Sequence, residues 1–226
     1  MLESFQSLEK RETLPKQIIN AFELSSIQEE KLKQIIIKNK GNIRIFIHPY
    51  YNTSNMTIGN SGILEKKDEK LMHLGFEKLI GIKGDDKTPL FVFEEKNQIS
   101  DLNDKVKEKL GRSIFLIPTH QDNSTPFFNE FKEGNYIKED QKSWNYLTLK
   151  FKEWGVQKIT LAGQSLALSF DEDGFYDSSY QFEGCAGQAL SELEDNFDIQ
   201  VSRFSYPLKR KDYNYYKKLN DEGRSD

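Results

Sequence analysis

Five short apolar runs alternate along the chain with longer stretches in which apolar residues recur every three or four positions. Short runs rich in Ile, Val and Phe are typical of strands, and the longer spacing is typical of amphipathic helices. This alternation favours parallel strands joined by right-handed crossover helices. We predict strands at residues 42–50, 89–95, 113–119, 158–163 and 198–206, and helices at residues 26–38, 65–81, 99–110, 140–154 and 184–195.

The three middle strands are nearly continuous apolar runs, "PLFVFEE", "SIFLIPT" and "KITLAG". A strand that is apolar on both faces lies in a sheet that is covered on both sides. We therefore predict an α/β fold, a three-layer α/β/α sandwich with about five mainly parallel strands in a Rossmann-like or flavodoxin-like order. In the first helix, Ser26 with Glu29 three residues later forms a capping-box signal, which predicts Ser26 as the N-cap.

Two polar stretches interrupt the alternation, at residues 50–62 and at residues 165–182. The second contains "EDG" between two β-prone arms, which predicts a β-hairpin insertion. We predict one α/β domain at residues 26–207, after a helical or irregular extension at residues 1–25 and before an edge element with a disordered tail at residues 208–226.

Composition narrows the class of protein and its partners. The formal net charge is −4 and the isoelectric point is about 5.6, which argues against a nucleic-acid partner. The N-terminal stretch lacks the apolar core of a signal peptide, and no apolar run is long enough for a membrane span. We expect a soluble, cytoplasmic protein with a small-molecule ligand and no membrane partner. The sequence leaves open whether it forms a homo-oligomer.

In an open parallel sheet, ligands bind at the edge where the carboxyl ends of the strands meet. Polar residues follow several predicted strands, and Gln164 and Ser165 follow the fourth. We therefore predict a substrate site at this edge. Its predicted catalytic residues are His120, Cys185 and His48, and its predicted substrate-binding residues are Glu94, Asp122, Gln164, Ser165, Gly184 and Gly187.

Cys185, the only cysteine, admits two interpretations. It begins a predicted helix in "FEGCAGQALSEL", where free backbone N–H groups and the helix dipole favour a thiolate nucleophile. His120 or Glu183 would then orient the thiol or act as its base, and Gly184 and Gly187 would let the backbone approach an oxyanion. Alternatively, Cys185 is a small residue packed where the helix meets the sheet, and this second interpretation is favoured.

The segments "LKFKEWGVQKITLAG" and "GCAGQALSELEDNFDIQV" together resemble the isochorismatase-like cysteine hydrolases. That family has a helix, a strand and a Gly, followed by a Cys at the next helix start. The resemblance implies an α/β hydrolase with Cys185 as its nucleophile. The chain has "FIHPYYN" where the family has an Asp after its first strand, its catalytic Lys has no evident counterpart, and the predicted hairpin separates Gly163 from Cys185. The resemblance is one of layout and does not assign the chain to that family.

Metal and phosphate sites have weaker signals. His48, His120, Asp122 and Glu94 are suitable ligand types for zinc, manganese or iron, but no HxH or HExxH spacing joins them. The segments "IGNSG" and "GCAG" lead into helices, yet neither matches a GxGxxG or P-loop motif. Metal content and cofactor therefore stay open.

The polar residues at one sheet edge predict a hydrolase-type enzyme that acts on a small polar substrate. His120 would act as general base or ligand, with His48 and Glu94 as orienting groups. Because no tight catalytic motif is present, a second interpretation stays open: a non-enzymatic ligand-binding or protein-interaction module on the same scaffold.

Overall fold

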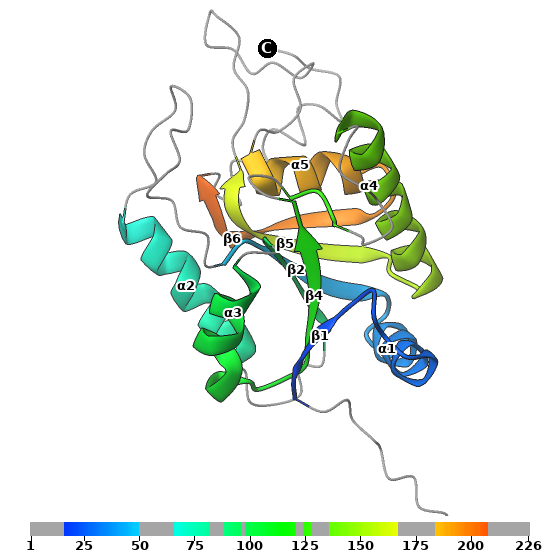
Figure 1. The fold of residues 1–226 in the computed structure, drawn as a ribbon, viewed down its shortest axis with the longest axis horizontal. Coiled ribbons are helices and arrows are strands. Elements are labelled where there is room, and N and C mark those ends of the chain that lie inside the picture. Colours follow the sequence, from blue (N-terminus) through cyan, green and yellow to red (C-terminus); the bar gives the residue numbers. More distant parts are fainter. Residues whose placement is uncertain are drawn as a thin grey trace, which may run out of the picture.

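The computed structural model describes residues 16–49, 66–81, 88–95, 98–120, 124–127, 136–166 and 184–207 (Figure 1). Several of the predictions fall on other residues, among them residues 1–15 of the predicted N-terminal extension and Glu183. Asp122, the predicted hairpin from residue 167 onward and the C-terminal segment from residue 208 onward lie outside the described ranges.

Six parallel strands form a single sheet in the described part of the chain (Figure 1). Five of them overlap the predicted strands, so the α/β class with a parallel sheet is confirmed. The first strand was not predicted; it has three residues and pairs in parallel with the fourth. The strands are β1 (Ile18–Asn20), β2 (Asn42–Ile47), β3 (Leu90–Glu95), β4 (Ile114–Thr119), β5 (Lys158–Leu166) and β6 (Asp198–Pro207).

The strand order is β1-β4-β3-β2-β5-β6. From β2 the chain adds β3 and then β4 on one side, and it later adds β5 and β6 on the other side. The direction of growth therefore reverses at β2, and the carboxyl ends of β2 and β5 flank the switch point. Open α/β sheets bind ligands in the crevice at such a point.

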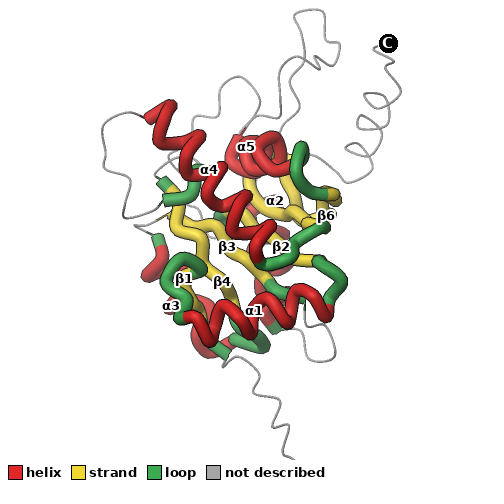
Figure 2. Tube along the Cα trace, turned by 90° about the vertical axis from the view of Figure 1, so that its right-hand side faces the viewer, coloured by secondary structure: helices red, strands yellow, loops and turns green. Residues whose placement is uncertain are grey.

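Helices cover both faces of the sheet, which confirms the three-layer sandwich (Figures 1 and 2). The α1 (Ser26–Lys38), α4 (Tyr136–Glu153) and α5 (Gly184–Leu193) helices lie on one face. The α2 helix (Lys66–Ile80) and the α3 helix (Ile99–Val106), which continues into the 3-10 helix η2 (Lys107–Lys109), lie on the other. None of the described helices is long and apolar enough to cross a membrane.

Alternation along the strands gives each face its own apolar core. On β2, Ile45 belongs to the core under α1, α4 and α5, and Phe46 belongs to the core under α2 and α3. The rings of Phe46 and Phe76 meet edge to face at 5.2 Å, and on the opposite face Phe91 stacks on Trp154 at 5.9 Å. Burial on both sides explains why β3 and β4 are apolar along nearly their whole length.

The N-cap of α1 is Ser25, one residue earlier than predicted, so the prediction of Ser26 was wrong. The Ser25 hydroxyl accepts a hydrogen bond from the backbone N–H of Gln28 at 3.3 Å, and the Gln28 side chain accepts from the Ser25 N–H at 3.0 Å. Glu29 has another role, because its carboxylate accepts a hydrogen bond from the Trp154 indole at 2.7 Å. The Trp154 hydrogen bond and the nearby Lys150 ammonium lower the pKa of Glu29.

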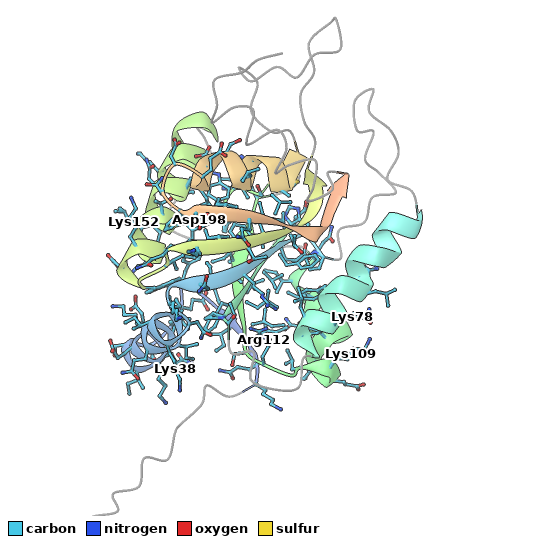
Figure 3. All side chains as sticks on the ribbon, turned by 180° about the vertical axis from the view of Figure 1, so that it is seen from behind. Lys38, Lys78, Lys109, Arg112, Lys152 and Asp198 are labelled. Atoms are coloured by element: carbon cyan, nitrogen blue, oxygen red, sulfur yellow. The ribbon has the colours of Figure 1, made fainter. Side chains whose placement is uncertain are left out.

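The charged side chains labelled in Figure 3 lie at helix ends or strand starts, which topology places at the amino edge of the sheet. Basic residues in the last turns of α1, α2 and α4 complement the helix dipoles there. Lys109 pairs with Glu77 at 2.8 Å and Lys158 pairs with Asp198 at 3.3 Å, both on the surface. The amino edge of the sheet is therefore a solvated surface, and its exposed ion pairs contribute little to stability.

Candidate active site at the carboxyl edge of the sheet

Buried polar side chains concentrate at the opposite edge, where the parallel strands end. Of the eight buried polar or charged residues in the described part of the chain, six lie there and the other two are Ser143 and Thr148 on α4. Burying polar groups costs free energy unless they are hydrogen-bonded, so their concentration here marks this edge as the candidate site. The six residues are His48, Glu94, Glu95, Thr119, Ser124 and Thr125.

His48 occupies an unusual backbone conformation directly after β2. Its φ angle is 47°, in the left-handed region, and Pro49 follows it. Its backbone N–H donates to the Phe93 carbonyl at 2.8 Å, which continues the pairing of β2 with β3 by one residue. A left-handed conformation costs a non-glycine residue about 1–3 kcal/mol, and such residues cluster at active sites, although Lys40 adopts one in the turn after α1. The turn at His48 therefore sets the direction of its side chain at a cost in stability.

The His48 ring reaches across the end of β3 to β4. Its Nε2 atom lies 3.1 Å from the Thr119 hydroxyl oxygen, and both side chains are completely buried. Burial lowers the pKa of His48 to about 3, because the charged imidazolium would lose its hydration. At neutral pH the ring is therefore an uncharged group with one donor and one acceptor nitrogen.

Two buried carboxyl groups lie on the strand between His48 and Thr119. Glu94 and Glu95 end β3, where their partners in β4 are Pro118 and Thr119. Consecutive strand residues point to opposite faces, so one carboxyl group lies on each face of the sheet edge. The Glu94 carboxylate accepts a hydrogen bond from the backbone N–H of Glu95 at 3.1 Å. Together, the ends of β2, β3 and β4 carry an imidazole, two carboxyl groups and a hydroxyl group.

At the switch point, β5 comes unusually close to β2. Gly163 has a φ of 130° and pairs with Ile47, and a Cβ atom at Gly163 would lie 2.3 Å from the Ile47 carbonyl oxygen. The register of β5 against β6 also shifts on both sides of Gly163, as in a β-bulge. Bulges redirect strands and are common beside active sites. Gln164 and Ser165 follow in β5, where the structure describes their backbone and not their side chains.

His120, the predicted general base, follows β4 and is half-buried. Its backbone N–H donates to the Thr125 carbonyl at 3.0 Å, and its ring packs edge to face on Phe127 at 5.0 Å. Residues 124–127, here named the return segment, fold back along β4 through an antiparallel bridge between Thr119 and Pro126. The structure places His48, Glu94 and His120 at the ends of three adjacent strands, β2, β3 and β4.

Gln188 of α5 joins the return segment to the helix that carries Cys185. Its side-chain oxygen accepts hydrogen bonds from the Ser124 backbone N–H at 3.1 Å and hydroxyl at 2.9 Å. Its side-chain nitrogen donates to the Thr125 hydroxyl at 3.0 Å. The sequence-based prediction missed Gln188, Ser124 and Thr125. The one available signal is a long polar residue within the small, apolar helix start "GCAGQAL".

Cys185 lies in the first turn of α5 and is 4% exposed. It belongs to the apolar core under α1, α4 and α5, together with Ala186 and Ala189. Buried thiols in apolar surroundings are poorly reactive, so this burial supports the packing interpretation of Cys185. Gly184 is the first residue of α5, and Gly187 is buried one turn later.

Two further polar atoms lie buried on α4, on the sheet face that carries α1 and α5. No hydrogen-bond partner is found among the described residues for the Ser143 hydroxyl or the Trp144 indole nitrogen. The Trp144 ring stacks on Phe93 at 6.0 Å, and the Phe93 carbonyl is the one that accepts from His48. Both atoms are available to donate to an acceptor on a bound molecule or to a buried water.

In the described part of the chain, no three His, Cys, Asp or Glu side chains lie close enough together to hold a metal ion. Comparisons with protein-family models, curated proteins and solved structures gave no match.

Proposed function

We propose that the chain is a hydrolase-type enzyme that binds a small polar substrate at the carboxyl edge of β2, β3, β4 and β5. The observation that carries the proposal is the hydrogen bond between His48 and Thr119 across the end of β3. A buried histidine in a left-handed conformation, at a strand end adjacent to the one that carries two buried carboxyl groups, is a costly arrangement of the kind that clusters at functional sites.

The proposed roles follow from position and exposure. His120 is half-buried and can meet a substrate, so it acts as the general base that takes a proton from the attacking water. His48 stays neutral and buried, and with Glu94 it orients polar groups of the substrate or of the water. Gln164 and the backbone N–H groups at the start of α5 bind the substrate or its developing oxyanion.

The scaffold supports this location. The order β4-β3-β2-β5-β6 is the order 3-2-1-4-5 of a Rossmann-like sheet, with one further parallel strand, β1, outside β4. In such sheets the ligand lies at the switch point, which here is flanked by the ends of β2 and β5. We further propose a soluble, cytoplasmic protein, in keeping with its polar composition and the apolar core within the sandwich.

The test is hydrolysis by the purified protein of chromogenic esters, phosphoesters and amides, each with a small polar acyl or phosphoryl group. The wild type should turn over at least one class, and Glu94→Gln should lower kcat/KM by about tenfold or more while the protein stays folded. Exposed Glu108→Gln, on η2, is the matched control and should keep full activity. No turnover of any class, or equal turnover by Glu94→Gln, would contradict the proposal.

One observation favours a second candidate, a non-enzymatic ligand-binding module. His48 is fully enclosed and neutral, and Cys185 is buried, so two of the three predicted catalytic side chains do not face solvent. A binding module would gain thermal stability from a small polar ligand without converting it. A ligand that raises Tm and is recovered unchanged after long incubation would favour this candidate over the enzyme.

A further inference from the structure

We infer that Gln188 is a positioning residue: through the return segment, it holds His120 in place from helix α5. This inference deepens the proposed function and rests on it only for the role of His120 as base. The connection itself is independent of that role. Its hydrogen bonds join the return segment, which follows β4, to a helix more than sixty residues later in the chain.

The Gln188 amide makes three hydrogen bonds to the return segment. Its oxygen accepts two hydrogen bonds from Ser124, and its nitrogen donates one to the Thr125 hydroxyl. Ser124 and Thr125 are both fully buried, so water cannot replace these bonds without opening the segment. Losing a partner of a buried polar group is costly, and the cost falls on the return segment rather than on the apolar core.

The return segment in turn determines where His120 lies. The Thr125 carbonyl accepts from the His120 backbone N–H at 3.0 Å, and the Phe127 backbone N–H donates to the Pro118 carbonyl at 2.6 Å. These bonds place the Phe127 ring against the His120 ring. Gln188 is thus two hydrogen bonds away from the His120 backbone, by way of Thr125.

Two substitutions of Gln188 distinguish a positioning role from a packing role. Gln188→Met keeps the length and the apolar contacts of the side chain and removes all three hydrogen bonds. Gln188→Glu keeps the two acceptor interactions with Ser124, and the Thr125 hydroxyl can reverse its role and donate to the carboxylate. A positioning role therefore predicts loss with Met and recovery with Glu, whereas a packing role predicts little change with Met.

Proton NMR of the histidine rings gives a readout that needs no substrate. The chain has three histidines, so the ring signal of His120 can be assigned with a single His120→Gln sample. Its protons carry a ring-current shift from Phe127, which Phe127→Leu removes as a reference. Gln188→Met should move the His120 signal most of the way to that reference and speed exchange of the His120 amide roughly tenfold. Gln188→Glu should restore both readouts.

Unchanged His120 signals and amide exchange in folded Gln188→Met would overturn the inference, as would failure of Gln188→Glu to restore them. If Gln188→Met does not fold, Thr125→Val decides by the same readouts, because it removes one of the three bonds and should give a smaller shift in the same direction. Failure of the proposed function is seen separately: His120 would then be held by Gln188 and yet be dispensable for turnover.

Discussion

The Nε2 atom of His48 lies 3.1 Å from the hydroxyl oxygen of Thr119, although β3 separates the strands that carry them. The contact forms because His48 leaves β2 in a left-handed conformation and its ring crosses the end of the neighbouring strand. It links the ends of β2 and β4 across β3, whose own end carries the buried carboxyl groups of Glu94 and Glu95.

Thr119→Val should destabilise the protein by about 1–3 kcal/mol, because it leaves the buried His48 nitrogen without the hydroxyl group. Urea unfolding followed by circular dichroism measures this change. Thr148→Val is the matched control, since Thr148 is a buried threonine on α4 away from His48, and it should cost clearly less. Equal losses in the two variants would show that the hydrogen bond adds nothing specific.

Stability should fall as the pH is lowered below the ordinary pKa of histidine. The pKa of His48 in the folded protein is about 3, lowered by burial from 6.5, so between these values the unfolded state binds a proton that the folded state does not. The free energy of unfolding contributed by His48 therefore decreases with falling pH in this window, by at most about 1.4 kcal/mol per pH unit. Because carboxyl groups also titrate there, the difference between wild type and His48→Gln is the quantity to measure, at pH 7.5, 6 and 5. If the free energy of unfolding depends on pH equally in the two proteins, this explanation is wrong.

Gly163→Ala should be more damaging than the same change at Gly155. Both glycines have positive φ, 130° and 83°, so both variants incur backbone strain of about 1–2 kcal/mol. At Gly163 the added methyl group would also meet Ile47 backbone atoms at 2.3 and 2.5 Å, whereas at Gly155 the nearest atom is 3.6 Å away. Overpacking should add about 1–3 kcal/mol at Gly163 alone. Thermal unfolding of both variants checks this, and a loss at Gly155 that equals the loss at Gly163 would show that β2 and β5 can separate easily.

Cys185 should react slowly with iodoacetamide in the native protein and rapidly in urea, because it is 4% exposed in an apolar core. Mass spectrometry of the alkylated protein over time gives both rates. Rapid native alkylation with an apparent pKa well below 8.5 would instead make Cys185 a nucleophile and would revive the resemblance to the cysteine hydrolases.

Local patterns predicted most of the scaffold. A strand that is buried on both faces has a nearly continuous apolar sequence, so β3, β4 and β5 could be located from the sequence. Three-residue β1 is too short to show such a pattern, and it is held by pairing with β4. The N-cap of α1 was placed one residue late because Glu29 looks like a capping-box residue, while its contact with Trp154 joins positions far apart in the chain.

The candidate site was predicted less completely, because its contacts join residues far apart in the chain. Strand ends identify His48, Glu94 and His120, because topology sends all carboxyl ends to one edge. The contact between His48 and Thr119 depends on strand order and on one positive φ angle, and neither is encoded in a local pattern. The three hydrogen bonds of Gln188 depend on how α5 lies against the return segment, which is likewise a tertiary relationship.

Turnover by two histidine variants tests the proposed site most directly. His120→Gln removes the proposed base at the carboxyl edge, and His73→Gln makes the same change on α2, outside the proposed site. On a substrate that the wild type hydrolyses, His120→Gln should lower kcat by about 100-fold or more with little change in Tm, and His73→Gln should retain wild-type kcat. Wild-type kcat in folded His120→Gln would contradict a catalytic site at this edge.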